Sequence, residues 1–393
     1  MANRREFLAR FLQTFLLFLF PEKIFAQLIP FAFFKKYTPP VTLWGWAANA
    51  TGVLGDGTTT DVAAPKQIGT DGNWRDISTG TTTTLAIKEP GTLWSWGAND
   101  VGQLGAGTSG AATYRSSPVQ VGTATDWSAI SLGAYNCLAL KTDGSLWSWG
   151  GGTDGALGFG NSTAKSTPTQ LGTDTDWATI RSAYHNCFAI KTNGTLWSWG
   201  LNDTGQLGSG TTAARSSPVQ VGALTDWAQI SSCGARAFGI KTDGTLWAWG
   251  ENGRGSLGLG DIAHRSSPVQ VGAGTWLKVS AGVSHTLGIM SNGTLWAWGA
   301  NGSGQLGTGN VINRSSPVQV GTATDWKEVA GSEGNTFAIK TTGTLWGWGI
   351  NSSGELGYGD TNNKSSPVQI GSATNWKKMD AAALDTHILA IQA

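Results

Sequence analysis

Residues 91–107 read Gly-Thr-Leu-Trp-Ser-Trp-Gly-Ala-Asn-Asp-Val-Gly-Gln-Leu-Gly-Ala-Gly, and a version of this stretch occurs seven times in the chain. Its central phrase, Leu-Trp-x-Trp-Gly, begins at Leu43 (where Ala47 replaces the final Gly), Leu93, Leu146, Leu196, Leu246, Leu295 and Leu345. Successive copies begin 49 to 53 residues apart. A period of that length is typical of repeat architectures. The 393 residues are therefore interpreted as one repeat array after a short leading segment.

Tryptophan recurs at three fixed positions in each repeat of this array. A further tryptophan follows each phrase, at Trp74, Trp127, Trp177, Trp227, Trp276, Trp326 and Trp376. These seven and the two in every phrase account for all 21 tryptophans of the chain. A residue type found only at repeated positions most often has a structural role. We therefore expect the tryptophans to pack between repeating units.

The unit that begins at Leu146 contains four short segments with the pattern of strands, residues 146–150, 169–171, 176–180 and 187–191. Asn193-Gly194 lies between the last of them and the next phrase, and Asn-Gly supplies the positive φ that hairpin turns require. Four short strands per repeat are typical of a β-propeller blade. No segment between them has a helical period, so we expect helices to be rare.

These patterns predict an all-β fold, a single seven-bladed β-propeller of four-stranded blades over residues 41–393. The last unit stops after its segment 388–391, and the first begins directly with its phrase, so the two partial units complement each other. We expect the N-terminal strand to pair with the C-terminal strands, which would leave no open sheet edge. The residues assigned to this ring closure are Leu43, Trp44, Trp46, Leu389 and Ile391.

A glycine turn follows every phrase. The three glycines of Gly-x-Leu-Gly-x-Gly are present in all seven copies, from Gly52 to Gly359. Such regular glycines indicate positive φ or a close approach of two chains. Six copies also carry an asparagine before the turn, at Asn49, Asn99, Asn202, Asn252, Asn301 and Asn351. We expect these side chains to bond their own loop and fix the turn.

Residues 1–40 form a short non-repeat arm. Asn3-Arg4-Arg5-Glu6-Phe7-Leu8 resembles a twin-arginine export signal, and an apolar stretch follows from Phe11 to Phe20. A basic end before a short apolar segment suits a targeting signal. Two alternatives remain open: an anchor in which residues 1–34 contact a membrane, or a packing arm of a larger assembly.

Charge and cysteine content exclude several classes of function. Lys plus Arg number 26 and Asp plus Glu number 25, so the chain has no electrostatic footprint for a phosphate backbone, and we expect no nucleic-acid partner. Cys137, Cys187 and Cys233 form no Cys-x-x-Cys motif, and the four histidines are scattered. We therefore expect buried thiols, no metal site and no cofactor.

One position is basic in six of the seven units, with Val62 as the exception, and we assign it to a candidate partner-binding crown: Arg115, Lys165, Arg215, Arg265, Arg314 and Lys364. The alternative is that these residues are solvated or pair locally with Asp126, Asp176, Asp226 and Asp325.

His185 and His285 nearly coincide in repeat register, and no carboxylate accompanies either one in register. We therefore expect no catalytic pair and no enzyme.

The pattern Gly-x-Leu-Trp-x-Trp-Gly-x-Asn-x-x-Gly-Gln-Leu-Gly-x-Gly, clearest at residues 91–107 and 293–309, resembles the repeat of the regulator of chromosome condensation family. The resemblance covers residues 41–393 and implies a seven-bladed propeller joined by both chain ends. Eukaryotic members are exchange factors for a small GTPase and bind nucleosomes, using an inserted hairpin for which the spacing here leaves no room. The plant UV-B photoreceptor of the family has a Gly-Trp-Arg-His-Thr motif. The matching residues here are Gly133-Ala134-Tyr135-Asn136-Cys137, which contain no tryptophan, so we do not expect photoreception.

The short, regular copies look most like bacterial or phage members, which commonly serve as extracellular or virion interaction modules. We therefore expect a non-enzymatic scaffold for protein partners or self-assembly, exported or part of a surface or virion structure. One alternative is a carbohydrate-binding or enzymatic propeller, in which sugars stack on Tyr114, Tyr135, Tyr184 and Tyr358. A GTPase exchange regulator ranks last.

Overall fold

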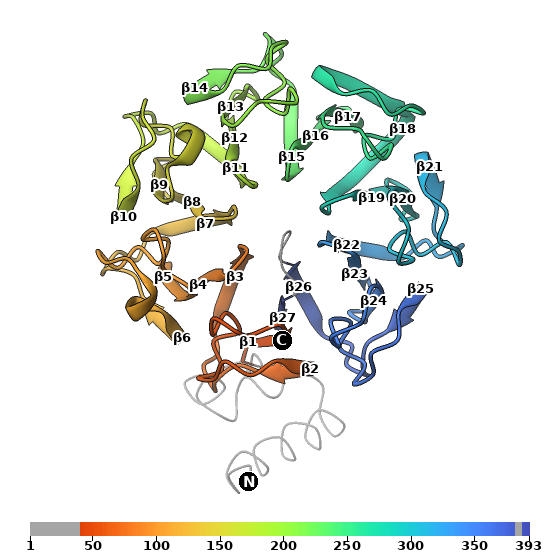
Figure 1. Ribbon diagram of the computed structural model, residues 1–393, viewed down its shortest axis with the longest axis horizontal. Coiled ribbons are helices and arrows are strands. Elements are labelled where there is room, and N and C mark those ends of the chain that lie inside the picture. The colour runs from red at the N-terminus through yellow and green to blue at the C-terminus, as the bar shows by residue number, and fades with distance from the viewer. Residues whose placement is uncertain (1–39, 382–386) are drawn as a thin grey trace, which may run out of the picture. The chain divides into compact units, whose positions relative to one another are not determined.

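The computed structural model describes residues 40–381 and 387–393, and Val41–Ala393 form one compact unit by themselves. In this unit seven antiparallel blades are arranged in a ring (Figure 1). The only helices among the described residues are two short 3-10 helices, η2 (Ala111–Thr113) and η3 (Thr153–Gly155). The prediction of an all-β propeller is therefore confirmed. The export, anchor and packing-arm interpretations concern an N-terminal segment that lies, up to residue 39, outside the described residues.

One blade illustrates the others. Its strand nearest the ring axis is β7 (Trp127–Leu132), followed outward by β8 (Asn136–Lys141), β9 (Leu146–Gly150) and the outermost β10 (Lys165–Gln170) (Figure 1). Three further blades repeat this order: β3 (Trp74–Thr79), β4 (Thr83–Lys88), β5 (Thr92–Gly97), β6 (Arg115–Gln120); β11 (Trp177–Ser182), β12 (Asn186–Lys191), β13 (Leu196–Gly200), β14 (Arg215–Gln220); and β22 (Trp326–Gly331), β23 (Asn335–Lys340), β24 (Leu345–Gly349), β25 (Lys364–Gln369).

Two neighbouring blades share a strand. β18 (Arg265–Ala281) is long enough to be the outermost strand of one blade and the inner strand of the next, which gives a seven-stranded sheet. The other members of this sheet are β15 (Trp227–Cys233), β16 (Arg236–Lys241), β17 (Thr245–Gly250), β19 (His285–Met290), β20 (Leu295–Gly299) and β21 (Arg314–Gln319).

The remaining blade combines both ends of the repeat region. Its strand order is β2-β1-β27-β26, with β1 (Thr42–Ala47), β2 (Val62–Gln67), β26 (Trp376–Ala381) and β27 (Ile388–Gln392). In the β1–β27 pair, Leu43 lies opposite Ile391 and Trp44 opposite Ala390. Asp380 on β26 accepts hydrogen bonds from the amide and hydroxyl of Thr79 on β3, at 2.6 and 2.9 Å. The blade made from both chain ends is thus bonded directly to the blade that follows it.

The outermost strands begin earlier than the sequence suggests. Residues 169–171 were expected to form the strand after Pro168, whereas β10 begins at Lys165, which lies opposite Gly150. Pro168 is tolerated within the strand because an outer edge strand needs no amide donor on its open side. In six of the seven units the basic residue therefore starts an outer strand, which begins earlier than the expected segment after the proline.

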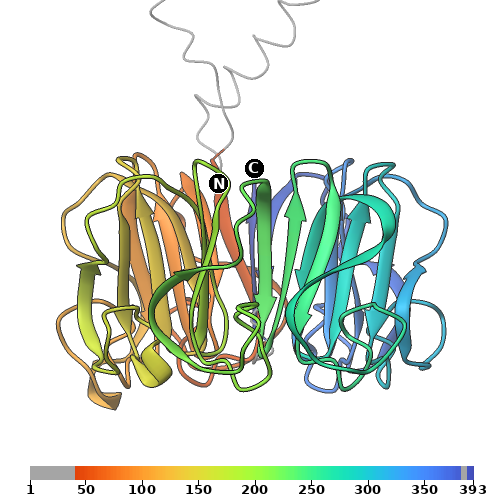
Figure 2. The same ribbon diagram turned by 90° about the horizontal axis from the view of Figure 1, so that it is seen from above.

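The ring has two distinct ends. At the hairpin face, turns such as Asn193-Gly194 connect the second and third strands, and the C-terminus at Ala393 lies there (Figure 2). At the opposite loop face lie the glycine loops and the turns that follow the inner strands. Every outer strand begins on the loop face, because its first residue is opposite the last glycine of the phrase.

The tryptophans join blade to blade, as expected from the repeat. The second tryptophan of each phrase is fully buried. Its Nε1 donates to a backbone carbonyl in the glycine loop of the preceding blade at 2.7–3.0 Å, in the pairs Trp46–Glu355, Trp96–Val53, Trp149–Gln103, Trp199–Ala156, Trp249–Gln206, Trp298–Ser256 and Trp348–Gln305. These seven bonds pass around the whole ring, including the blade formed by both chain ends.

The glycine loops are held by the asparagines that precede them. All three glycines of each loop have positive φ, as predicted. In one loop, the Asn202 Oδ1 accepts the amide of Leu207 at 2.9 Å, and its Nδ2 donates to the carbonyls of Thr211 and Ala213 at 3.0 and 2.9 Å. Asn202 is fully buried, so these three hydrogen bonds satisfy its amide group in place of water.

We expect the Asn202→Ala variant to lose about 2 kcal/mol of folding stability, because the buried Leu207 amide and two carbonyls lose their partner. The measurement is the urea midpoint compared with that of the wild type. Thr212→Ala, an exposed change in the same loop, is the control and should leave the midpoint unchanged. Equal midpoints for both variants would show that the asparagine does not hold the loop.

Candidate functional site: the loop face and its axial pocket

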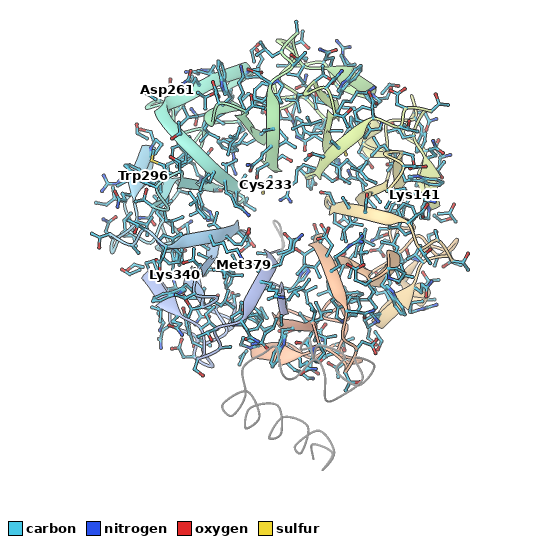
Figure 3. All side chains as sticks on the ribbon, turned by 180° about the vertical axis from the view of Figure 1, so that it is seen from behind. Lys141, Cys233, Asp261, Trp296, Lys340 and Met379 are labelled. Carbon is cyan, nitrogen blue, oxygen red and sulfur yellow. The ribbon has the colours of Figure 1, made fainter. Side chains whose placement is uncertain are left out.

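The six basic residues of the proposed crown each begin one outer strand, namely β6, β10, β14, β18, β21 and β25. Their surroundings differ. Arg265 pairs with Asp261 at 2.5 Å and Lys364 with Asp360 at 3.0 Å, whereas the buried Nε of Arg314 has no hydrogen-bond partner in the described part of the chain. Asp261 marks this outer rim in Figure 3, far from Cys233 near the axis. The crown residues are thus spaced one per blade around the rim.

The aspartates expected to neutralise these residues have other partners. Each pairs at 3.0–3.3 Å with the lysine that ends the second strand of its own blade, in the pairs Asp126–Lys141, Asp176–Lys191, Asp226–Lys241 and Asp325–Lys340. Each lysine also lies over two tryptophan rings; Lys191 Nζ is 4.7 Å from the centre of Trp177. The predicted pairing is wrong because these aspartates are on the hairpin face, at the other end of the blade.

Exposed tyrosines gather on the loop face. Tyr135 and Tyr184 are 38% and 40% exposed and lie in the turns after β7 and β11, in neighbouring blades. Tyr114 precedes β6 in the blade before them, and its hydroxyl donates to Asp100. Tyr358 differs, because its hydroxyl donates to the carbonyls of Gly347 and Val368 within its own blade. Tyr135 and Tyr184 are therefore the exposed members of this group.

A histidine and a carboxylate lie beside these tyrosines. His185 Nδ1 is 2.9 Å from Asp154 Oδ2, and its ring stacks on Tyr184 with centroids 4.2 Å apart. Asp154 has a φ of 56° and comes from the preceding blade. This carboxylate belongs to the preceding blade, so a comparison of the histidines in repeat register does not reveal it. The detectable sequence departure is Gly151–Asp154, which replaces the Ala-Asn-Asp-Val of residues 98–101.

The second histidine belongs to a buried clamp between blades. His285 is fully buried, and its Nε2 is 3.0 Å from Thr336 Oγ1. Nearby, the buried Arg236 donates to Ser256 Oγ at 3.0 Å and to the Gly282 carbonyl at 2.5 Å. Burial, assisted by the charge of Arg236, lowers the pKa of His285 to about 3. His285 is therefore neutral and structural at physiological pH.

This depressed pKa predicts acid sensitivity. An unfolded histidine takes up a proton below about pH 6.5, whereas folded His285 does so only near pH 3. The stability that it contributes is present above pH 6.5 and is lost as pH falls, by up to about 1.4 kcal/mol per pH unit. The variant His285→Asn introduces the residue found at the equivalent position of three other blades, as Asn136, Asn186 and Asn335. We expect its urea midpoint to fall less than that of the wild type between pH 7 and 4.5; parallel curves would contradict this assignment.

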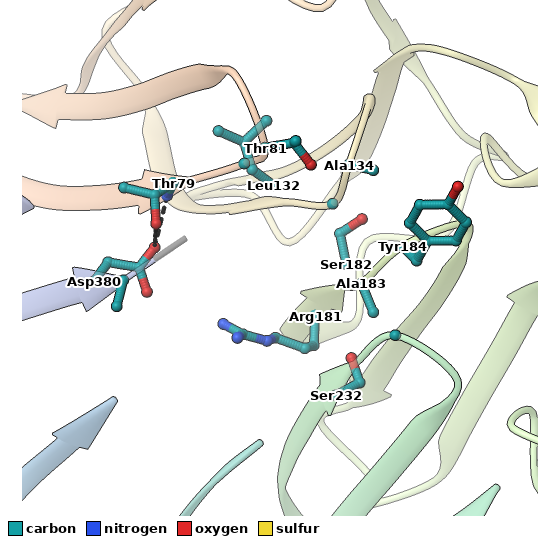
Figure 4. Close-up of a pocket in the computed structure, with 14 residues that line it drawn as sticks. Thr79, Thr81, Leu132, Ala134, Arg181, Ser182, Ala183, Tyr184, Ser232 and Asp380 are labelled. Atoms are coloured by element: carbon teal, nitrogen blue, oxygen red, sulfur yellow. Dashed lines mark hydrogen bonds between the residues drawn. The ribbon is translucent and has the colours of Figure 1, made fainter. Parts of the chain in front are cut away.

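A small pocket lies on the ring axis, where β3, β7, β11, β15 and β26 end at the loop face. Its two charged lining residues are Arg181 and Asp380, and Figure 4 shows the Arg181 guanidinium extending toward the side on which Asp380 lies. Thr81, Tyr184 and Ser232 also line it. No group of three or more potential metal ligands occurs among residues 40–381 and 387–393.

Arg181 interrupts a bonding pattern of the inner strands. At its repeat position most blades carry an acceptor for an amide of the next blade, in the pairs Ser78–Leu132, Ser131–Ser182, Ser231–Ala281, Ser280–Gly331 and Asp380–Thr79. A guanidinium cannot accept a hydrogen bond. The sequence interpretation missed both Arg181 and Asp380, although alignment of the inner strands would have revealed them as the charged departures from serine.

The fold and its loop face define a repeat-built β-propeller. The model of the regulator of chromosome condensation (RCC1) repeat matches residues 90–140, 143–190, 193–237, 243–289, 292–339 and 342–391. A second model of the same repeat matches residues 127–156 and 276–305. The chain belongs to the RCC1 repeat family. No curated protein sequence matches it significantly.

Solved structures of similar fold include three at low sequence identity. Yeast RCC1 (Prp20) bound to Kap60 is 19% identical, with a TM-score of 0.81 over 90% of this chain and 89% of that chain. Prp20p from Saccharomyces cerevisiae, described with its binding properties to Gsp1p and histones, is 19% identical, with a TM-score of 0.79 over 91% and 92%. Human WBSCR16 is 18% identical, with a TM-score of 0.79 over 90% and 99%. These similarities establish the fold alone.

Proposed function

We propose that the protein is a non-enzymatic interaction module that binds a protein partner through its loop face. The observation that carries this proposal is the placement of exposed Tyr135 and Tyr184 on adjacent blades. Large aromatic side chains contribute most of the binding energy at many protein interfaces. The turns that present them are attached to strands of a rigid sheet, an arrangement common in binding proteins.

The class of partner is supported by the similar folds. Kap60 is bound to yeast RCC1 in one structure, and Gsp1p and histones are the binding partners described for Prp20p. These partners are proteins, and the present chain displays loops on the same type of scaffold. GTPase exchange remains the last-ranked alternative, because the regular repeat spacing leaves no room for an inserted hairpin.

Site-specific photocrosslinking tests this proposal. A photoreactive residue at Tyr135 or Tyr184 should crosslink one defined protein in the native host, whereas the same residue at the exposed Thr192 on the hairpin face should not. With that partner purified, the double change Tyr135→Ala/Tyr184→Ala should weaken the Kd at least about tenfold without lowering the Tm. Full affinity of the double variant would reject the loop face. Turnover of a substrate that a single substitution abolishes would reject the non-enzymatic role.

We also propose that the protein acts outside the cytoplasm, on a surface or in a virion. This rests on the twin-arginine-like motif Asn3–Leu8 and the apolar stretch behind it. Intact mass and N-terminal sequencing of native protein provide the test. A start at Gln27 supports export, while a start at Met1 or Ala2 means that the arm is retained and contradicts cleavage.

A further inference from the structure

We propose that the loop face carries a second docking surface, formed by Ile262, Val311 and Ile312, for a protein segment that combines apolar and acidic side chains. This inference goes beyond the proposed function, because it assigns a surface on other blades than those of Tyr135 and Tyr184 and gives the chemistry of its partner. It rests on four observations: the exposure of the three side chains, their departure from the repeat, the hydrogen bonds that hold their loops, and the arginines beside them.

The first observation is the exposure of three aliphatic side chains in neighbouring loops. Ile262, Val311 and Ile312 are 66%, 60% and 57% exposed, more than any other large apolar side chain among the described residues. Ile262 precedes β18 and the other two precede β21, which begin as the outer strands of adjacent blades (Figure 1). The amide of Gly260 donates to the carbonyl of Ser315 at 2.8 Å and joins the two loops. Exposed apolar side chains that gather in this way mark interaction sites, whereas scattered ones do not.

The second observation is that these residues depart from the repeat. The residue equivalent to Ile262 and Val311 is polar and exposed in four other blades, as Thr59, Ser162, Thr212 and Thr361. An isoleucine or valine at this place gains no burial within the fold, because its side chain remains in water. The framework therefore does not explain the apolar side chains, whereas contact with a partner does.

The third observation is that hydrogen bonds hold both loops in place. Asn301 Nδ2 donates to the carbonyls of Asn310 and Ile312 at 2.9 and 3.1 Å. The amide of Asn301 donates to Asn313 Oδ1 at 2.8 Å. The other loop is held in the same way by Asn252. The backbone beside the exposed side chains is thus fixed before a partner arrives, which lowers the entropy lost on binding.

The fourth observation is positive charge without a local counterion. In the first loop the arginine that starts the outer strand has a carboxylate four residues before it, in the Asp261–Arg265 pair at 2.5 Å. Arg314 has Asn310 at that position, and its buried Nε has no hydrogen-bond partner in the described part of the chain. Arg254 is exposed, and it forms no ion pair with any described residue. Two cations in these loops are therefore left for a partner.

Both arginines lie beside the contact between the loops. A Cβ on Gly255 would lie 2.5 Å from the Cα of Ser315, so these two residues touch. Arg254 directly precedes the first of them, and Arg314 directly precedes the second. Glu251, the other carboxylate of the first loop, is already in an ion pair. The surface thus combines aliphatic side chains with positive charge, and an apolar segment that carries carboxylates is complementary to it.

A protein segment fits this surface better than a membrane does. Tryptophan and tyrosine are enriched where proteins meet a membrane interface. The loop residues 251–265 and 300–314 contain neither residue type. A small apolar centre with polar and charged residues around it is instead the usual composition of a protein interface.

Selection from a random peptide library displayed on phage, with the purified full-length protein as bait, tests the proposal. We expect the enriched peptides to combine leucine, isoleucine or phenylalanine with aspartate or glutamate, and to bind as synthetic peptides in fluorescence anisotropy. The triple change Ile262→Thr/Val311→Thr/Ile312→Thr should weaken their Kd about tenfold or more, because it removes the apolar contact. Arg254→Ser should also weaken the Kd and should reduce its dependence on salt concentration.

Two controls accompany these variants. The triple variant should keep the wild-type Tm, because threonine already stands at equivalent positions of other blades, at Thr59, Thr60, Thr163, Thr212 and Thr361. Leu277→Thr is the matched control for the loss of an exposed aliphatic side chain. Leu277 is 49% exposed and lies toward the hairpin face, so this variant should bind the peptides like the wild type.

Three results would overturn the proposal: no enriched peptide, enrichment of basic peptides, or an affinity that the triple variant leaves unchanged. Without peptide binding, sedimentation with phosphatidylcholine–phosphatidylglycerol vesicles that the triple variant abolishes would replace the protein segment with a membrane surface. Dimers that the triple variant abolishes would replace it with a second copy of this chain. Tyr135→Ala/Tyr184→Ala should bind the peptides like the wild type, so failure of the tyrosine site and failure of this surface are distinguishable.

Discussion

We expect the Trp249→Ala variant to lose about 4 kcal/mol of folding stability, measured as the shift of its urea unfolding curve. Trp249 is fully buried, and its ring meets Phe188 of the neighbouring blade and Trp227 of its own blade edge to face, with centroids 6.2 and 5.8 Å away. Its removal opens a large cavity between two blades. It also leaves the buried carbonyl of Gln206 without the indole donor at 2.9 Å.

Two companion variants separate these contributions. Trp247→Ala alters the same strand, but Trp247 is only partly buried and bonds Thr245 Oγ1 of its own strand. Its loss should be about 1–2 kcal/mol, less than half that of Trp249. Trp249→Phe keeps most of the ring but removes the indole donor, and we expect an intermediate loss. If Trp247→Ala destabilised the protein as much as Trp249→Ala, the joint between blades would not carry the stability assigned to it.

The second large effect concerns the hairpin turn at Gly194. We expect Gly194→Ala to lower the free energy of unfolding by at least about 3 kcal/mol. The residue has a φ of +77°, a conformation that costs a residue with a Cβ about 1–2 kcal/mol. In addition, its Cβ would lie 2.1 Å from the carbonyl oxygen of Thr225 in the next blade. Since that oxygen belongs to the backbone, two blades would have to move apart.

Gly172→Ala is the matched control for this steric effect. Gly172 has a similar φ of +69°, but a Cβ there would meet nothing within 4 Å. Its loss should be limited to the conformational cost of about 1–2 kcal/mol. The difference between the two Tm values therefore measures the close approach at Gly194. Equal Tm values would mean that the blades adapt to the methyl group without cost.

Periodicity explains why the framework could be predicted from the sequence. The second tryptophan of each phrase is fully buried and each loop glycine has a positive φ in every blade, so seven repetitions of one pattern define one local structure. The Asn193-Gly194 turn and the rarity of helices were predicted from the same repeated sequence pattern. The bounds of the outer strands were predicted less well. The strand was expected to begin after Pro168, although an outer edge strand accommodates proline.

The possible ion pairs of the basic residues were assigned from distance along the chain, and this criterion was wrong. Arg115 and Asp126 are only eleven residues apart, yet the strand β6 between them carries the chain from the loop face to the hairpin face. Six residues of β-strand span about 20 Å, which is too far for an ion pair. Asp126 instead meets Lys141, which returns to the hairpin face on β8. Strand direction decides this pairing, and repeat register alone does not show it.

The candidate site could be predicted least well, because it consists of departures from the repeat. Asp154 meets His185 from the preceding blade, so two different repeats must be considered together before the pair is visible. Arg181 and Asp380 are separated by about two hundred residues and approach one another only because both inner strands border the axis. A single repeat contains neither relationship. Such contacts require the ring to be assembled first.

The pairing of β1 with β27 also has a mechanical consequence. Thr42 lies opposite Gln392 in this antiparallel pair, so the chain enters and leaves the sheet at the same end. A tensile load applied at Val41 and Ala393 would peel the hydrogen bonds apart one after another, whereas a load along opposed ends would shear them all at once. Traction between Val41 and Ala393 would therefore open the β1–β27 pair one residue pair at a time. Tethering through one end alone would leave it unloaded.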